Sequence, residues 1–182
     1  MKSLNELPVV SLMWKKGSSV RPGFELHGKE GIFATLTFQD QTLTLARVDT
    51  AEGAWTFKHL GLIAPVVTVR TEGGTTNLAT FHPHALRHGK LHFHDGKVHD
   101  WVWLHEAVPS GAFLDPEGMP LLRLRARELS AAPELEQCEV DLGLASANRS
   151  RLALLAALGW YLILFDHMKE RDAVSAETAL RL

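Results

Sequence analysis

The stretch from Leu152 to Phe165 reads LALLAALGWYLILF and is apolar at every position except Gly159. A helix that is apolar on all sides has no face to offer to water, so it must be enclosed by the rest of the protein or by lipid. This single requirement limits the chain to folds that can surround a helix completely.

Length and flanking charge favour enclosure by protein. As a helix, the fourteen residues rise only about 21 Å, whereas a membrane-spanning helix needs about 20 apolar residues. Charged residues flank the run closely, with Arg149 and Arg151 before it and Asp166 and Lys169 after it. A longer span would have to bury these ions. We therefore expect a core helix rather than a transmembrane segment.

The chain before this helix, from Val9 to Leu144, has the pattern of β-strands. Short β-branched and aromatic runs alternate with Gly, Asp and Pro, without a sustained helical period. Short turn signals such as EGG at Glu72 to Gly74 favour antiparallel hairpins. The predicted strands are Val9 to Trp14, Gly31 to Phe38, Thr42 to Val48, Trp55 to His59, Leu62 to Arg70, Thr75 to Phe81, Lys90 to His94, Lys97 to Leu104, Leu121 to Arg127 and Glu139 to Leu144.

A long antiparallel sheet has two unpaired edges, and closing it into a barrel removes them. A barrel of about ten or more strands is wider than its own side chains can fill. The apolar helix, capped near Asn148 or Ser150, is the natural filling. The sequence therefore predicts one mainly β domain over residues 1–182. Its fold is an antiparallel closed β-barrel of about 10–12 strands that encloses a C-terminal hydrophobic helix at about 149–170.

Three segments resemble the tubby C-terminal-like superfamily, which includes the plant LURP-one-related proteins and the phospholipid scramblases. They are FHDGKVHDWVW at Phe93 to Trp103, FLDPEGMPLLRLRA at Phe113 to Ala126, and LLAALGWYLILF at Leu154 to Phe165. The resemblance implies a twelve-stranded barrel around a central hydrophobic helix. The chain lacks a phosphoinositide-binding Lys/Arg pattern like that of tubby and a scramblase-like cysteine-rich or calcium-binding segment. The resemblance therefore transfers neither a lipid function nor a residue role.

Seven of the ten histidines lie between His82 and His105. If Asp95 and Gly96 form the centre of a two-residue hairpin turn, His92 faces His99 on the neighbouring strand. Strand alternation then directs polar and aromatic side chains outward from the barrel. The predicted outward set is Lys90, His92, His94, Lys97, His99, Trp101, Trp103 and His105.

This basic and aromatic face is typical of a site for an anionic lipid headgroup, a small ligand or a protein partner. The strand RLRAR adds an outward row of Arg123, Arg125 and Arg127. A solvated edge that resists aggregation also explains the arginines. Cover from a loop or a second subunit also explains the tryptophans.

A metal site is the alternative interpretation of the same face. His92, His94 and His99 on one face could share a zinc, copper or iron ion, as in a cupin-like small-molecule enzyme. Lys90 and Lys97 would repel such an ion, and solvated histidines explain the pattern without a metal.

Other function classes find little support. A net charge of -2 gives no global attraction to nucleic acid. The single Cys138 cannot form an internal disulfide, which suits a cytoplasmic protein, and the start at Met1 to Pro8 lacks the apolar core of a signal peptide. No nucleophile elbow, P-loop or dinucleotide fingerprint is present. We therefore expect a non-enzymatic binding module without a cofactor, able to form a homo-oligomer.

Overall fold

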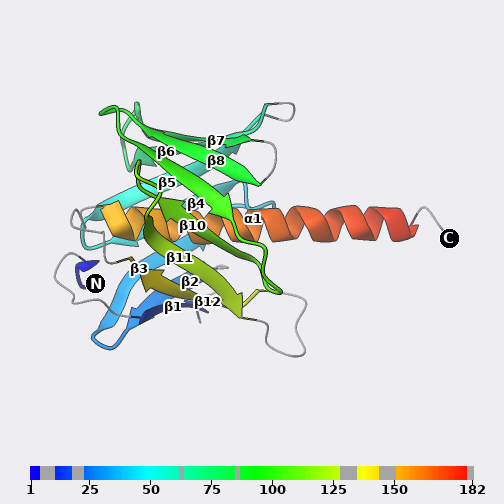
Figure 1. Cartoon of the computed structure of the whole chain (residues 1–182), viewed down its shortest axis with the longest axis horizontal. Helices are drawn as coiled ribbons and strands as arrows, with labels where there is room; N and C mark the ends of the chain where they lie inside the picture. The colour runs from blue at the N-terminus through cyan, green and yellow to red at the C-terminus, as the bar shows by residue number, and fades with distance from the viewer. Residues whose placement is uncertain are drawn as a thin grey trace.

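In the computed structural model the chain forms a closed antiparallel barrel of twelve strands with one long helix along its axis (Figure 1). The structure describes residues 1–4, 11–17, 23–61, 64–84, 87–127, 135–143 and 151–179. Each strand pairs with its neighbours in sequence, and β1 pairs with β12 to close the barrel. The predicted fold, a closed barrel around a C-terminal apolar helix, is confirmed.

The twelve strands are five to eight residues long and follow one another as a simple meander. Their bounds are β1 Ser11–Lys16, β2 Gly23–Gly28, β3 Gly31–Phe38, β4 Leu45–Thr50, β5 Gly53–Leu60, β6 Val66–Thr71, β7 Asn77–His84, β8 His88–Phe93, β9 Val98–Trp103, β10 Ser110–Leu114, β11 Pro120–Arg127 and β12 Gln137–Leu142. The predicted strand ends at Val9, Leu62 and Leu144 lie outside the described residues.

The strands alternate between the barrel interior and its outer surface. In β11, Leu122, Leu124 and Ala126 are buried, whereas the three arginines between and after them are exposed. This two-residue period is what a sheet with one dry and one wet face requires.

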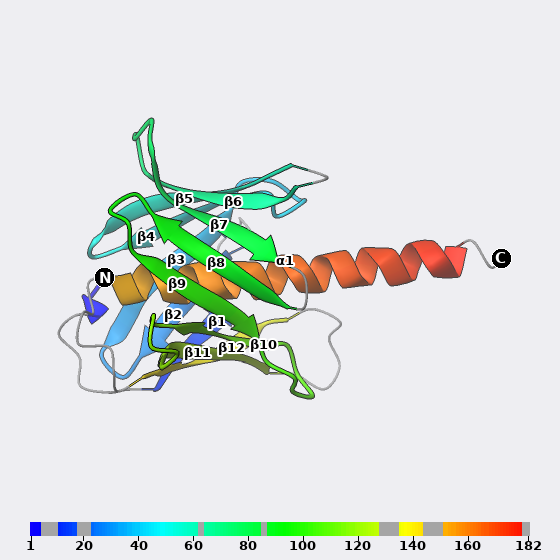
Figure 2. The ribbon, with the colours of Figure 1, turned by 45° about the horizontal axis from the view of Figure 1, so that its top comes forward.

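The helix α1, Leu152–Ala179, fills the barrel with its first fourteen residues, all of which are buried (Figure 2). Aromatic rings fix it to the wall: the Trp160 ring centre lies 5.3 Å from that of Phe24, and the Tyr161 ring centre lies 5.6 Å from that of Phe57. By length and composition alone, the stretch from Leu152 to Val174 is long enough to cross a membrane, and it is mostly buried inside the barrel.

The helix continues beyond the predicted end near residue 170 and projects out of the barrel toward the C-terminus (Figures 1 and 2). Described side chains from Lys169 to Val174 are exposed, including Val174 at 64%. The predicted caps, Asn148 and Ser150, lie outside the described residues.

Two strands, β2 and β10, were not predicted. In β2 only Phe24 and Leu26 face the interior, and the segment is framed by glycines. β10 reads SGAFL, whose small residues gave little strand signal. Its Gly111 is needed for packing, because a Cβ atom there would lie 2.3 Å from the Trp101 ring.

Candidate functional site

The hairpin of β8 and β9 turns through a three-residue loop rather than the predicted two-residue turn. The backbone N–H of Phe93 donates to the carbonyl of Lys97 at 2.9 Å, and Gly96 adopts a left-handed φ of 84°. As a result Leu91, not His92, pairs with His99. A shift of one residue turns every side chain of a strand to the opposite face. The predicted outward placement of His99, Trp101 and Trp103 is therefore wrong.

All three side chains now belong to the interior side of β9. Trp101 is fully buried, with its ring centre 4.7 Å from that of Phe113. Trp103 packs against the core, and His99 is half-buried in a T-shaped contact with the Phe93 ring. The outer face therefore loses the aromatic character that the predicted binding surface needed.

The remaining members of this hairpin stay outside. Lys90, His92, His94 and Lys97 are exposed. Lys90 forms an ion pair, with its Nζ 2.7 Å from Oδ1 of Asp100 on the neighbouring strand.

The arginine row of β11 lies outside as predicted, but carboxylates neutralise it. Arg125 and Arg127 both donate to Glu139, and their hydrogen bonds lower the pKa of that carboxyl. Arg123 pairs with Glu106. This pairing favours a solvated, self-compensated strand face over a site for an outside anion.

The three histidines of the metal interpretation do not converge. His92 and His94 are exposed on the outside, while His99 lies on the interior side of β9. Across the described parts of the chain, no group of three or more His, Cys, Asp or Glu side chains is arranged to hold an ion.

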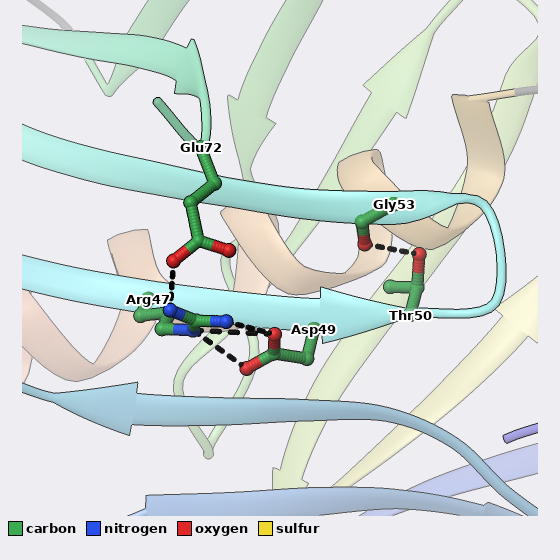
Figure 3. A network of polar contacts seen from close by, with 5 residues as sticks. All are labelled: Arg47, Asp49, Thr50, Gly53 and Glu72. Atoms are coloured by element: carbon green, nitrogen blue, oxygen red, sulfur yellow. Dashed lines mark hydrogen bonds and ion pairs between the residues drawn. The ribbon is translucent and has the colours of Figure 1, made fainter. Parts of the chain in front are cut away.

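A second polar surface, on β4 to β6, is also internally paired. Arg47 lies between two carboxylates, donating from Nε and Nη2 to Asp49 at 2.8–3.2 Å and from Nη1 to Glu72 (Figure 3). The hydroxyl of Thr50 donates to the carbonyl of Gly53 and closes the adjoining turn. This network links β4 to the end of β6 across β5, so we assign it a structural role.

Several cavities beside the helix lie where α1 leaves the barrel (Figure 1), an end that we call the mouth. Three cavities of about 320, 190 and 120 Å³ surround helix residues 162–171 there. At the opposite end, the Arg151 guanidinium pairs with Asp95 at 2.6 Å and lies over the Phe93 ring, 4.0 Å from its centre. These three cavities therefore lie at the end of the barrel away from Arg151 (Figure 1).

The 320 Å³ cavity, which we call the mouth pocket, is mainly apolar. Its apolar lining consists of Phe24, Phe38, Leu43, Leu135, Leu164 and Met168. Lys16, Arg171 and His167 add cationic or titratable groups, and Asp40 adds a carboxylate. Lys16 lies 3.5 Å from Glu136. A mainly apolar pocket with a few polar groups is the usual form of a small-molecule site.

One wall of the mouth pocket is held in a strained backbone conformation. Leu43 has a left-handed φ of 54°, which costs a non-glycine residue about 1–2 kcal/mol. The loop is fixed by Asp40, which accepts hydrogen bonds from the backbone N–H of Thr44 at 2.9 Å and from its hydroxyl at 2.6 Å. The surrounding contacts thus hold the Leu43 side chain at the pocket.

The 190 Å³ cavity on another side of α1 is more polar. It is lined by Arg87, Glu106, Asp166 and Glu170 among others. Burial, with a further contribution from Glu170, raises the pKa of Asp166. Arg87 is the second non-glycine residue with positive φ in the described chain, at 60°. Both strained positions therefore lie at the mouth.

Sequence reasoning did not find the mouth pocket. Its lining comes from the ends of β1 and β3, the start of β2, the β3–β4 loop, Leu135 just before β12, and the helix. The only local signal is the change from apolar to charged residues after Phe165, which marks where the helix emerges.

The half-buried His99 predicts that part of the stability of the fold is lost in acid. Burial, followed by the charge of Arg151, lowers the pKa of His99 below its ordinary 6.5. The unfolded chain therefore takes up a proton at a higher pH than the folded chain. The resulting stability is complete above pH 6.5 and declines as the pH falls from 6.5 toward the lower folded pKa.

We expect the melting temperature to fall between pH 7 and pH 5, and to fall less in His99→Leu. Thermal unfolding of both proteins across this range measures the difference, and subtracting the two profiles cancels the groups that they share. Identical slopes would show that His99 does not contribute.

The chain matches no known protein-family model, no curated protein and no solved structure.

Proposed function

We propose that this protein is a non-enzymatic binding module that holds a small amphiphilic anion, such as a single-chain lipid or fatty acid, in the mouth pocket. The mouth pocket itself carries the proposal, because its apolar wall is bordered by Lys16 and Arg171. An apolar tail would lie against Leu164 and Met168, and the anionic group would lie near the two cations.

The size of the pocket limits the ligand. At about 30 Å³ for each non-hydrogen atom, 320 Å³ has room for about ten such atoms. Octanoate has that size, and octanol is its uncharged counterpart. A longer chain would extend past the mouth into solvent or a membrane surface.

The outer strand face supports the same function less well. Its arginines are paired with Glu106 and Glu139, and Lys90 is paired with Asp100. An anion binding there would compete with these carboxylates, and Trp101 and Trp103, the apolar surface that a tail would need, lie on the interior side of β9.

Calorimetric titration with octanoate and octanol tests the proposal. We expect one equivalent of octanoate to bind, and Arg171→Gln to weaken it about five-fold, which corresponds to about 1 kcal/mol. Met168→Trp should fill the pocket and abolish binding. Arg125→Gln, on the outer face, is the matched control and should leave the affinity unchanged.

A parallel flotation assay with phosphatidylglycerol vesicles distinguishes two sources of the ligand, a free amphiphile in solution and a lipid in a membrane. Vesicle binding that Met168→Trp removes would identify a membrane lipid as the source. Failure of octanoate to bind, or unchanged affinity in Met168→Trp, would refute the mouth pocket as the site.

The strained Leu43 gives a prediction that separates binding from stability. In Leu43→Gly, relief of about 1–2 kcal/mol of backbone strain offsets much of the lost packing of this partly buried side chain. We expect the melting temperature to stay within a few degrees of the parent and octanoate affinity to fall about ten-fold. A large loss of stability with unchanged affinity would give Leu43 a purely structural role.

A further inference from the structure

The outer face of β7 and β8 carries a group of histidines that the mouth pocket does not involve. Two are on β7, His82 and His84, and two are on β8, His88 and His92; all four are exposed. Because the strands are paired in register, these side chains project from the same face of one hairpin.

One pair of these histidines is in direct ring contact. His92 pairs with Thr80 and His82 with Lys90, so His82 and His92 are diagonal neighbours. Their ring centres lie 5.5 Å apart with the planes at 80°. With metal–nitrogen bonds of about 2.1 Å, two imidazoles sharing an ion at a tetrahedral angle have ring centres about 5 Å apart. Both side chains are exposed, so rotation about their side-chain torsions can turn one nitrogen of each ring toward a shared ion.

The neighbouring Lys90, whose charge would repel a cation between these rings, is paired with a carboxylate. Lys90, cross-strand from His82, directs its Nζ to Asp100 on β9, 2.7 Å away. The ion pair compensates its charge on the side of the hairpin away from β7. Of the three histidines in the metal interpretation drawn from the sequence, His92, His94 and His99, only His92 belongs to this pair.

We propose that His82 and His92 together bind a divalent transition-metal ion, with water completing its coordination. Imidazole nitrogen suits Cu(II), Ni(II) and Zn(II), and among these Cu(II) binds such ligands most strongly. The described residues offer no third protein ligand, so the site is open and exposed. This inference is independent of the amphiphile pocket.

Titration of the untagged full chain with Cu(II) in a non-coordinating buffer at pH 7.5 tests the site. We expect one equivalent to bind, with an electron paramagnetic resonance spectrum showing nitrogen ligands. Loss of groups that merely orient a ligand costs about 10–100-fold in metal affinity. His82→Ala and His92→Ala should each weaken binding by at least that much.

The double variant His84→Ala/His88→Ala is the matched control, because it removes two exposed histidines from the same face and leaves the proposed pair. Its Cu(II) affinity should stay within two-fold of the parent. Circular dichroism should show that all variants keep the fold. The proposal is overturned if the parent takes up no Cu(II), if His82→Ala binds like the parent, or if the double variant loses the ion.

Discussion

Leu155→Asp should abolish the folded barrel. Leu155 is 2% exposed, within the fourteen residues of α1 that fill the interior. Truncating a buried leucine costs about 2–5 kcal/mol, and an unpaired carboxylate in an apolar core adds several more. The sum is comparable to the whole stability of a typical domain, about 5–15 kcal/mol. We expect loss of soluble expression or of a cooperative thermal transition.

The same helix provides its own control. Val174, in the projecting part, is 64% exposed, so Val174→Asp adds the same charge to the same element without burial. It should express and melt like the parent. If Leu155→Asp also gives a soluble protein with a cooperative transition near that of the parent, the helix is not enclosed by the strands.

The closed barrel around a helix was predictable because the apolar run at Leu152 to Phe165 has to be enclosed. An apolar run without a polar face requires enclosure, and a meander of short strands can supply it by closing. The tight turns between strands then fix an antiparallel order in which neighbours in sequence pair. The two strands that were not predicted, β2 and β10, contain glycines and small residues, which have low strand propensity but allow close packing.

The register of the β8–β9 hairpin was not predictable from the turn alone. Asp95 and Gly96 fit a two-residue turn, but Gly96 at φ 84° equally ends a three-residue loop. Which of the two loops forms depends on whether the Trp101 ring can pack inside the barrel. The space for this ring is created by glycines on two other elements, so no local pattern near the turn could reveal it.

The candidate sites also depend on contacts between elements that are distant in the sequence. The exposed histidines of β7 and β8 are visible as a cluster in the sequence, but their pairing depends on the register. The mouth pocket assembles residues from both ends of the chain, such as Lys16 and Arg171. Periodicity places each residue inside or outside, but it does not bring distant segments together.

Two glycines make room for Trp101 between the barrel wall and the helix. A Cβ atom on Gly111 of β10 would lie 2.3 and 2.5 Å from Trp101 ring atoms. A Cβ atom on Gly159 of α1 would lie 3.0 Å from the same ring and 2.7 Å from a methyl of Leu124. The one position that interrupts the apolar run is therefore the one where the helix meets the tryptophan.

Gly111→Ala should consequently destabilise the barrel, although alanine is small and apolar. The new methyl would overlap a ring that is fixed between wall and helix, and overpacking of this kind costs about 1–3 kcal/mol or somewhat more. Gly73→Ala is the control. Its φ of 73° is unfavourable for alanine, but nothing lies within 4 Å of the added Cβ. We expect it to cost only about 1 kcal/mol.

A double-mutant cycle identifies the tryptophan as the cause. Trp101→Leu alone should cost about 2–4 kcal/mol, because it leaves a cavity beside Gly111 and Gly159. In Gly111→Ala/Trp101→Leu the methyl enters that cavity, so the combined loss should be smaller than the sum of the single losses by at least about 1 kcal/mol. Denaturant unfolding of the four proteins measures the coupling. Additive losses would mean that Trp101 does not occupy the space beside Gly111, and that the register deduced for β9 is incorrect.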